Sequence, residues 1–126
     1  MPKTVPRVAG APPPVGPYSV ATEANGFVFI SGQVAFDPAG GATPDDLRGQ
    51  TKLVLENIGA ILGSLGLHYT DVVKTTVFLA DIGDFSAFNQ VYAGYFENEP
   101  PARTTVQAGA LPGAGLKVEI DVVAAR

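Results

Sequence analysis

The chain has 126 residues, the usual length of one domain, and its 46% hydrophobic and 16% charged residues fit a folded protein rather than a disordered one. It has no cysteine, which excludes disulfides and zinc–thiolate sites, and its formal net charge of −4 without a basic run argues against nucleic-acid binding. No stretch approaches the roughly 20 apolar residues that span a membrane, and the N-terminus lacks the apolar core of a signal peptide, so we expect a cytoplasmic protein without a membrane partner.

The N-terminal part predicts an irregular segment followed by a β-hairpin. Prolines interrupt residues 1–17, and each fixes φ and removes a backbone donor. Residues 18–23 and 27–33 are β-rich runs on either side of the Asn25-Gly26 pair, which tolerates the positive φ angles of a tight turn. Gly32 predicts a place where another backbone or a ligand approaches closely.

Residues 44–65 predict the first helix. Thr43 is the expected N-cap and Pro44 the first helical residue, and Gly66 is the expected C-terminal cap. An apolar stripe recurs at helical spacing at Leu47, Val54, Leu55, Ile58, Ile61, Leu62 and Leu65. The polar positions Gln50, Lys52 and Glu56 are predicted to face solvent.

The middle of the chain predicts a strand and a second helix. Val72 to Leu79 is β-branched and nearly continuous in apolar residues, which is typical of a buried, central strand. Asp84 is placed to cap a helix that runs to about Phe96. Its expected buried face is aromatic and comprises Phe85, Phe88, Val91, Tyr92, Tyr95 and Phe96.

Residues 100–126 predict two strands joined by a Gly/Pro-rich loop, at 102–108 and 116–124. If the two strands pair as an antiparallel hairpin with Arg103 opposite Glu119, one face is polar and the other largely apolar. Arg103 and Glu119 are then expected on one surface, where the arginine grips a carboxylate and the glutamate takes a proton from water. An ordinary cross-strand ion pair explains the same spacing.

The element order is β-β-α-β-α-β-β, which predicts one α+β domain over residues 1–126, with a mixed sheet and two helices packed on one face. The open face is expected to carry Arg103 and Glu119 and to be a surface for self-association.

Other chemistry lacks support in the sequence. The loop after residue 108 is neither a phosphate loop nor a dinucleotide fingerprint. His68, the only histidine, follows the helix cap without a catalytic constellation, and Ser19, Ser31 and Thr105 have no histidine partner. The scattered acids form no metal loop, so we expect no metal.

A set of short motifs resembles one family along nearly the whole chain. The motifs are Gly16-Pro17-Tyr18-Ser19, Ser31-Gly32-Gln33, Asn57-Ile58, Val73 to Leu79, Phe88-Asn89, Tyr92, Tyr95-Phe96, Pro101-Ala102-Arg103 and Val118-Glu119-Ile120. Each is weak alone, but their order and spacing together resemble the Rid (reactive intermediate deaminase) family, also called YjgF.

The resemblance implies a chorismate-mutase-like fold in a homotrimer with three clefts between subunits. It also implies hydrolysis of 2-imino acids, or their enamine tautomers, to 2-oxo acids and ammonia without a cofactor. Arg103 matches the family residue that holds the substrate carboxylate, and Glu119 matches the acid that positions or deprotonates the attacking water. Tyr18, Ser31 and Asn89 match residues that line the cleft.

The chain departs from the family pattern at Val20, where many members carry Gln, and at Thr105, a substrate-binding position where many carry Cys. The loop at residues 112–116 is one residue longer than the commonest form. These departures bear on substrate size and rate. Two other functions stay open, namely a non-catalytic, carboxylate-binding or chaperone-like trimer and an endoribonuclease or translation inhibitor, which the acidic charge disfavours.

Overall fold

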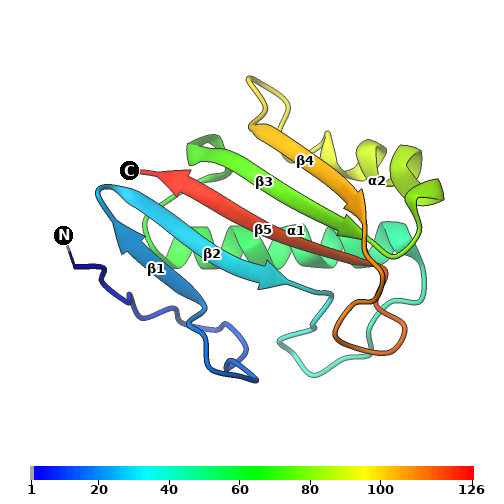
Figure 1. Cartoon of the computed structure of the whole chain (residues 1–126), viewed down its shortest axis with the longest axis horizontal. Helices are drawn as coiled ribbons and strands as arrows, with labels where there is room; N and C mark the ends of the chain where they lie inside the picture. Colours follow the sequence, from blue (N-terminus) through cyan, green and yellow to red (C-terminus); the bar gives the residue numbers. More distant parts are fainter. Residues whose placement is uncertain (1) are drawn as a thin grey trace.

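Five strands form one mixed sheet that carries both helices on one face (Figure 1). The computed structural model describes residues 2–126, so Met1, the first residue of the predicted irregular segment, lies outside the described part. The elements are β1 (Ala21–Ala24), β2 (Phe27–Gln33), α1 (Leu47–Ser64), β3 (Val72–Leu79), α2 (Phe85–Tyr92), β4 (Ala102–Gln107) and β5 (Val118–Ala125). The predicted α+β class and element order are confirmed. Neither helix in this part of the chain has the length and apolarity to cross a membrane.

The first hairpin forms as predicted. Asn25 and Gly26 both have positive φ angles, 52° and 81°, and the pair Ala24 and Phe27 closes the turn. The first strand is shorter than predicted, because regular pairing begins at Ala21 rather than at Tyr18.

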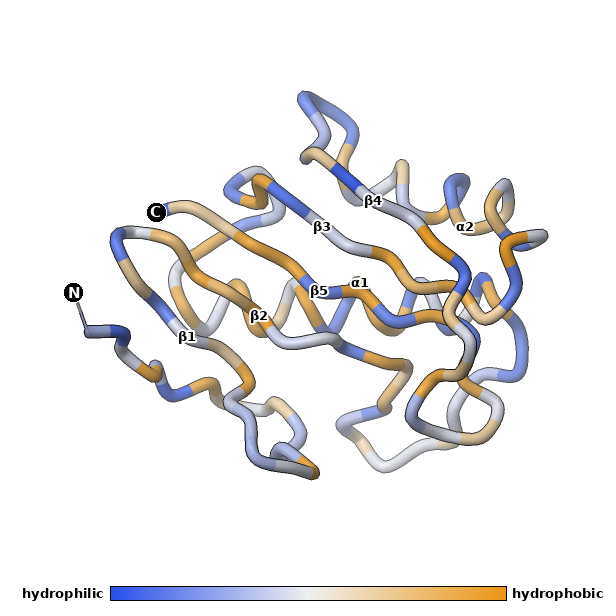
Figure 2. The backbone as a smooth tube through the Cα atoms, in the orientation of Figure 1, coloured by the Kyte–Doolittle hydropathy of each residue, from blue (hydrophilic) through white to orange (hydrophobic). Residues whose placement is uncertain are grey.

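The predicted pairing of the last two strands is wrong. The order of strands is β1-β2-β5-β3-β4, so β5 lies in the middle of the sheet, antiparallel to both β2 and β3, while β4 is an edge strand parallel to β3. Helix α2 provides the crossover that a parallel pair requires. Alternate residues of β5, from Val118 to Ala124, are at most 1% exposed, and such a strand needs a neighbour on each side. Figure 2 shows the resulting apolar band along β2, β5 and β3.

Helix α1 covers the buried face of the sheet. It begins after Asp46, whose carboxylate accepts the amide of Gly49, so the predicted N-cap Thr43 is wrong by one turn. At the other end Gly66 has φ +75° and follows the last helical turn, as predicted. The predicted stripe is buried, with Val54, Leu55, Ile58 and Leu62 at 0% exposure.

One polar position of α1 contradicts its prediction. Lys52 and Glu56 are exposed as expected, but Gln50 is 0% exposed. Its side-chain amide makes three hydrogen bonds to backbone groups, and these replace the solvent that the prediction assumed.

Helix α2 and the residues just after it bury a row of aromatic side chains. Phe88, Tyr92 and Phe96 are buried and stack in sequence, with ring centroids 5.3 and 4.6 Å apart. The predicted burial of Phe85 is wrong, because this ring is 42% exposed at the start of the helix. The α-helix also ends at Tyr92, four residues before the predicted end.

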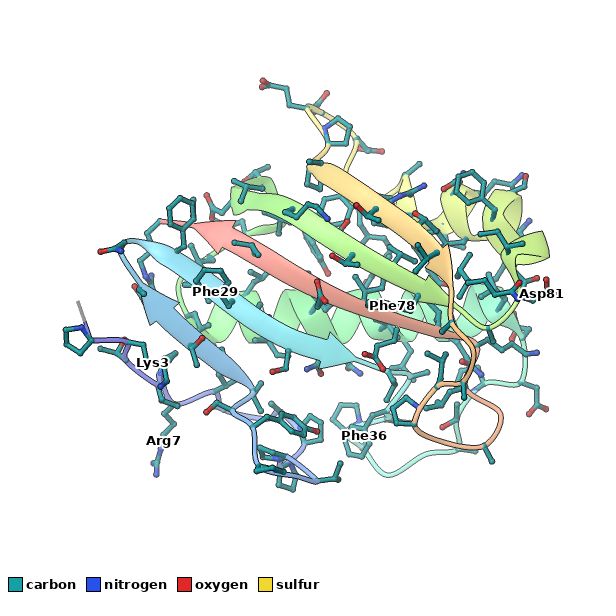
Figure 3. All side chains as sticks on the ribbon, viewed as in Figure 1. Lys3, Arg7, Phe29, Phe36, Phe78 and Asp81 are labelled. Atoms are coloured by element: carbon teal, nitrogen blue, oxygen red, sulfur yellow. The ribbon has the colours of Figure 1, made fainter. Side chains whose placement is uncertain are left out.

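The second face of the sheet is open, as predicted, and it is apolar near its edges. Phe27 and Phe29 of β2 and Val106 of β4 are each more than 40% exposed. Figure 3 shows Phe29 and Phe78 over this face, which neither helix covers.

A pair of substitutions in α2 tests this packing. We expect Phe88→Ala to lower the free energy of unfolding by about 3–5 kcal/mol, because the ring is fully buried. The matched change Phe85→Ala, one turn earlier on the exposed side, should cost less than about 1 kcal/mol. Urea denaturation of both variants at one protein concentration measures the difference, and equal losses would contradict the assigned burial.

Candidate functional site

The structure divides the predicted site residues into two groups on opposite faces of the sheet. Arg103 and Asn89 lie together on the face that the helices cover. Tyr18, Ser31 and Glu119 line a groove on the open face. The prediction that Arg103 and Glu119 share one surface of a single chain is therefore wrong. The reason is that β4 pairs with β3 instead of β5, so that Arg103 lies beside Thr75.

Arg103 is held against helix α2. One terminal nitrogen of its guanidinium donates to Asn89 Oδ1 at 2.7 Å. The guanidinium carbon also lies 4.8 Å from the ring centroid of Tyr92 and 5.4 and 5.5 Å from those of Phe88 and Phe85. These contacts fix the position of the cation without neutralising it. Within residues 2–126, the only ion pair joins Arg126 and Glu23, so Arg103 has no acidic partner there.

The ring that lies nearest to Arg103 is itself fixed. Tyr92 Oη and Thr75 Oγ1 are 2.8 Å apart, and Thr75 is fully buried in β3. Burial raises the pKa of Tyr92, while the Thr75 hydrogen bond and the Arg103 charge lower it. The tyrosine is therefore neutral at ordinary pH and provides an aromatic face for the arginine.

A cavity of about 340 Å³ opens beside the arginine. Its lining residues are Asn89, Tyr92, Ala93, Phe96, Pro100, Pro101 and Arg103. Most of this surface is apolar and one charged group projects from it, which is the composition of a site for a small organic anion.

The second groove has a volume of about 590 Å³ and lies on the open face. Its polar residues are Tyr18, Ser19, Thr22, Ser31, Glu119 and Asp121, and its apolar walls include Val15, Phe29, Pro112 and Val123. Glu119 and Asp121 lie two residues apart on β5, and every second side chain of a strand projects to the same side. Both carboxylates therefore face this groove.

A β-bulge in β2 shapes this groove. The β2–β5 register changes between Ile30 and Gln33, which leaves Ser31 and Gly32 opposite one residue of β5. A Cβ atom at Gly32 would collide with the carboxylate of Glu119, so the group that closely approaches this glycine in the chain is a side chain and not the backbone or ligand that was predicted. Ser31 Oγ donates to the Ser19 carbonyl at 2.6 Å and fixes the adjoining N-terminal segment.

The environment of Glu119 raises its pKa above the ordinary value of 4.5. Burial of the carboxyl is the larger cause, and the charge of Asp121 is the second. A carboxylate with a raised pKa is a stronger base than a solvated one, and it is suited to accept a proton from water.

Three features of the site were missed or misplaced by the sequence prediction. Thr105 is on the same side of β4 as Arg103 but lines neither groove. The aromatic contacts of Arg103 and the second carboxylate, Asp121, were not predicted. The two-residue spacing of Glu119 and Asp121, which puts both on one face of a strand, was the available signal for Asp121. Within the described chain, no group of three or more His, Cys, Asp or Glu side chains is arranged to hold a metal ion.

Comparison with known proteins gives consistent matches over almost the whole chain. A family model described as endoribonuclease L-PSP matches residues 8–126. A goat (Capra hircus) protein named 2-iminobutanoate/2-iminopropanoate deaminase is 48% identical over 117 residues, which cover 92% of this chain and 85% of the goat protein.

Solved structures agree with these matches. A Yersinia pestis protein of unknown function in the conserved Rid family, YyfA, is 41% identical with a TM-score of 0.91, and the match covers 99% of this chain and all of the other. Escherichia coli TdcF with bound serine is 37% identical with a TM-score of 0.88, and 98% of each chain is covered.

The two causes of the Glu119 pKa shift are separable by mutation. We expect Asp121→Asn to lower the pKa of Glu119 but to leave it above 4.5, because burial of the carboxyl persists. A carbon-13 NMR titration of the glutamate carboxyls measures this pKa, and the resonance is assigned by its loss in Glu119→Gln. The control Asp45→Asn, an exposed acid outside the groove, should change nothing. An unchanged Glu119 pKa in Asp121→Asn would contradict the coupling.

Proposed function

The chain belongs to the Rid (YjgF) family, and from this premise we propose that it hydrolyses small 2-imino acids, or their enamine tautomers, to 2-oxo acids and ammonia without a cofactor. The observation that carries the proposal is the pair of half-sites. Arg103 is a fixed cation with no acid beside it in the described chain, and Glu119 is a carboxylate of raised pKa in a groove on the other face.

Arg103 is the proposed anchor for the substrate. Its guanidinium fork suits a carboxylate, with which it forms two parallel, charge-assisted hydrogen bonds. Asn89 and the ring of Tyr92 already fix its orientation, so little side-chain entropy is lost when the anion binds.

Glu119 is the proposed base for the attacking water. The carbon of a protonated imine is electrophilic, so catalysis requires mainly that a water molecule be oriented and deprotonated. Water adds to this carbon while Glu119 takes its proton. The proton then passes from Glu119 to the nitrogen of the tetrahedral intermediate. As the C–N bond breaks, Glu119 takes the proton of the hydroxyl group, which leaves the carbonyl of the 2-oxo acid, and this proton departs with ammonia as ammonium.

A complete site requires two chains, because the two half-sites lie on opposite faces of one sheet. A small imino acid held by Arg103 of one chain does not reach Glu119 of the same chain through the sheet. An interface that joins the helix-side cavity of one copy to the open face of the next uses two different surfaces. Such contacts form a ring when the rotation between neighbouring copies closes. We propose that the ring is a homotrimer with three such sites, and the exposed Phe27 and Phe29 on the open face support burial there.

The proposed substrates are short-chain 2-imino acids such as 2-iminobutanoate and 2-iminopropanoate. The goat relative's name supports this class, and the serine bound to TdcF is likewise a small molecule with one carboxylate. The cavity beside Arg103 is apolar and accommodates a short alkyl chain.

Two substitutions test the assigned roles. We expect Arg103→Ala to lower kcat/KM by at least about 100-fold through lost carboxylate binding, and Glu119→Gln to lower kcat by about 10²–10⁴-fold through lost proton transfer. The assay generates the imines in place from amino acids and measures competition with semicarbazide trapping.

Arg7→Ala and Glu97→Gln make the same charge changes at exposed positions and should behave as wild type. If the wild type binds 2-oxo acids without accelerating imine loss, a binding protein replaces the deaminase as the better account.

A mixing experiment tests whether the site is shared between chains. Arg103→Ala and Glu119→Gln chains are unfolded together, refolded at equal amounts and assayed. A shared site needs an intact Arg103 from one chain and an intact Glu119 from its neighbour. In a random mixture each is present in half of the cases, so we expect about a quarter of the wild-type activity per site. A site within one chain would give no recovery, and refolding each variant alone is the control.

A further inference from the structure

Gln50 is a fully buried amide at the start of helix α1 and belongs to neither half-site. Its Nε2 atom donates to the carbonyls of Pro44 and Gly115, both at 2.9 Å, and its Oε1 atom accepts the amide of Lys117 at 2.8 Å. Both amide hydrogens and the oxygen are therefore used. A buried amide that satisfies three backbone groups fixes the segments to which they belong.

Two of these bonds hold the loop of residues 108–117, which joins β4 to β5. The ends of this loop are attached to the end of β3, where the Ala108 amide donates to Leu79 and the Ala80 amide donates to Lys117, at 2.8 and 2.9 Å. Between these ends, within the described chain, Gln50 is the only side chain that hydrogen-bonds to the loop. It holds the two backbone groups on either side of Leu116, as a neighbouring strand would.

The same loop forms a wall of the Glu119 groove. Pro112, in its middle, lines the groove, and Lys117, at its end, stands two residues before Glu119. Gly115 has φ +76°, a conformation that glycine adopts without strain and that turns the loop back toward β5. A change in the loop near Gly115 therefore moves the Pro112 wall, while Glu119 stays paired within β5.

We propose that Gln50 is a positioning residue that holds loop 108–117 over the Glu119 groove and so sets the affinity for substrate. The kinetic part of this inference rests on the proposed deaminase function. Without the Gln50 amide, the Gly115 carbonyl and the Lys117 amide lose their partners, and the loop gains the freedom to leave the groove.

The test compares Gln50→Met with a matched control, Thr51→Val. Thr51 is the next residue, is also 0% exposed, and bonds only within α1, from its Oγ1 to the Leu47 carbonyl at 2.8 Å. Both substitutions remove buried hydrogen bonds made by side chains of α1, but only Gln50→Met removes hydrogen bonds to the loop of residues 108–117. Hydrogen exchange of the Lys117 amide reports on the loop, and KM and kcat report on the site.

We expect Gln50→Met to speed exchange at Lys117 by about tenfold or more and to raise KM by about tenfold, with kcat within about twofold of wild type. Thr51→Val should leave all three unchanged under conditions where both variants are folded. Should Gln50→Met fold poorly, Gln50→Glu is measured instead. It keeps an acceptor for Lys117 but loses the donor to both Pro44 and Gly115, so KM should rise with less change in exchange at Lys117.

Two outcomes overturn the inference. One is equal exchange at Lys117 in Gln50→Met and Thr51→Val, and the other is faster exchange in Gln50→Met with an unchanged KM. If the wild type does not hydrolyse imines, the deaminase proposal fails by itself. Calorimetric affinity for 2-oxobutanoate, measured beside the exchange rates, then replaces KM and decides the role of Gln50.

Discussion

Successive side chains of a strand point to opposite faces of the sheet, and the helices cover only one of these faces. This alternation decides on which face each candidate site residue lies. β5 occupies the middle of the sheet, and its inward residues from Val118 to Ala124 are at most 1% exposed. The fixed packing of that face leaves Glu119 on the other side. β4 is parallel to β3 and pairs Arg103 with the buried Thr75. The side chain of Arg103 therefore lies on the face opposite to Glu119, where it contacts helix α2. Everything proposed about assembly follows from this division.

The local elements could be predicted from the sequence because short-range physics determines them. Asn25-Gly26 specifies its turn through two positive φ angles, and the β-branched run of β3 has the predicted bounds. The order of strands could not be predicted in this way. A hairpin between neighbouring strands is the simplest pairing, but β5 buries more apolar surface between β2 and β3 than it would at an edge.

The sequence singled out residues that the structure places beside two separate cavities, but it did not predict this separation. Glu119 and Tyr18 line one groove, and Arg103 and Asn89 line the other. The error about their common face came from the assumed pairing. Gln50 illustrates a different limit. Its position among polar residues of α1 indicated solvent, and only the path of a loop some 65 residues later in the sequence shows why it is buried.

The separation of Arg103 from Glu119 leaves the charge of the arginine unpaired and keeps the pKa of the glutamate raised. In the cross-strand pair first expected, the arginine would lower the pKa of Glu119 and would have its own charge occupied. In the structure, aromatic rings and an amide hold the arginine, so its charge has no acidic counter-ion in the described chain and stays available for the proposed substrate carboxylate. Asp121 in turn opposes ionisation of Glu119, which strengthens it as a base. A fold that places the two on opposite faces keeps the cation available and the carboxylate basic, which is what the proposed two-chain site requires.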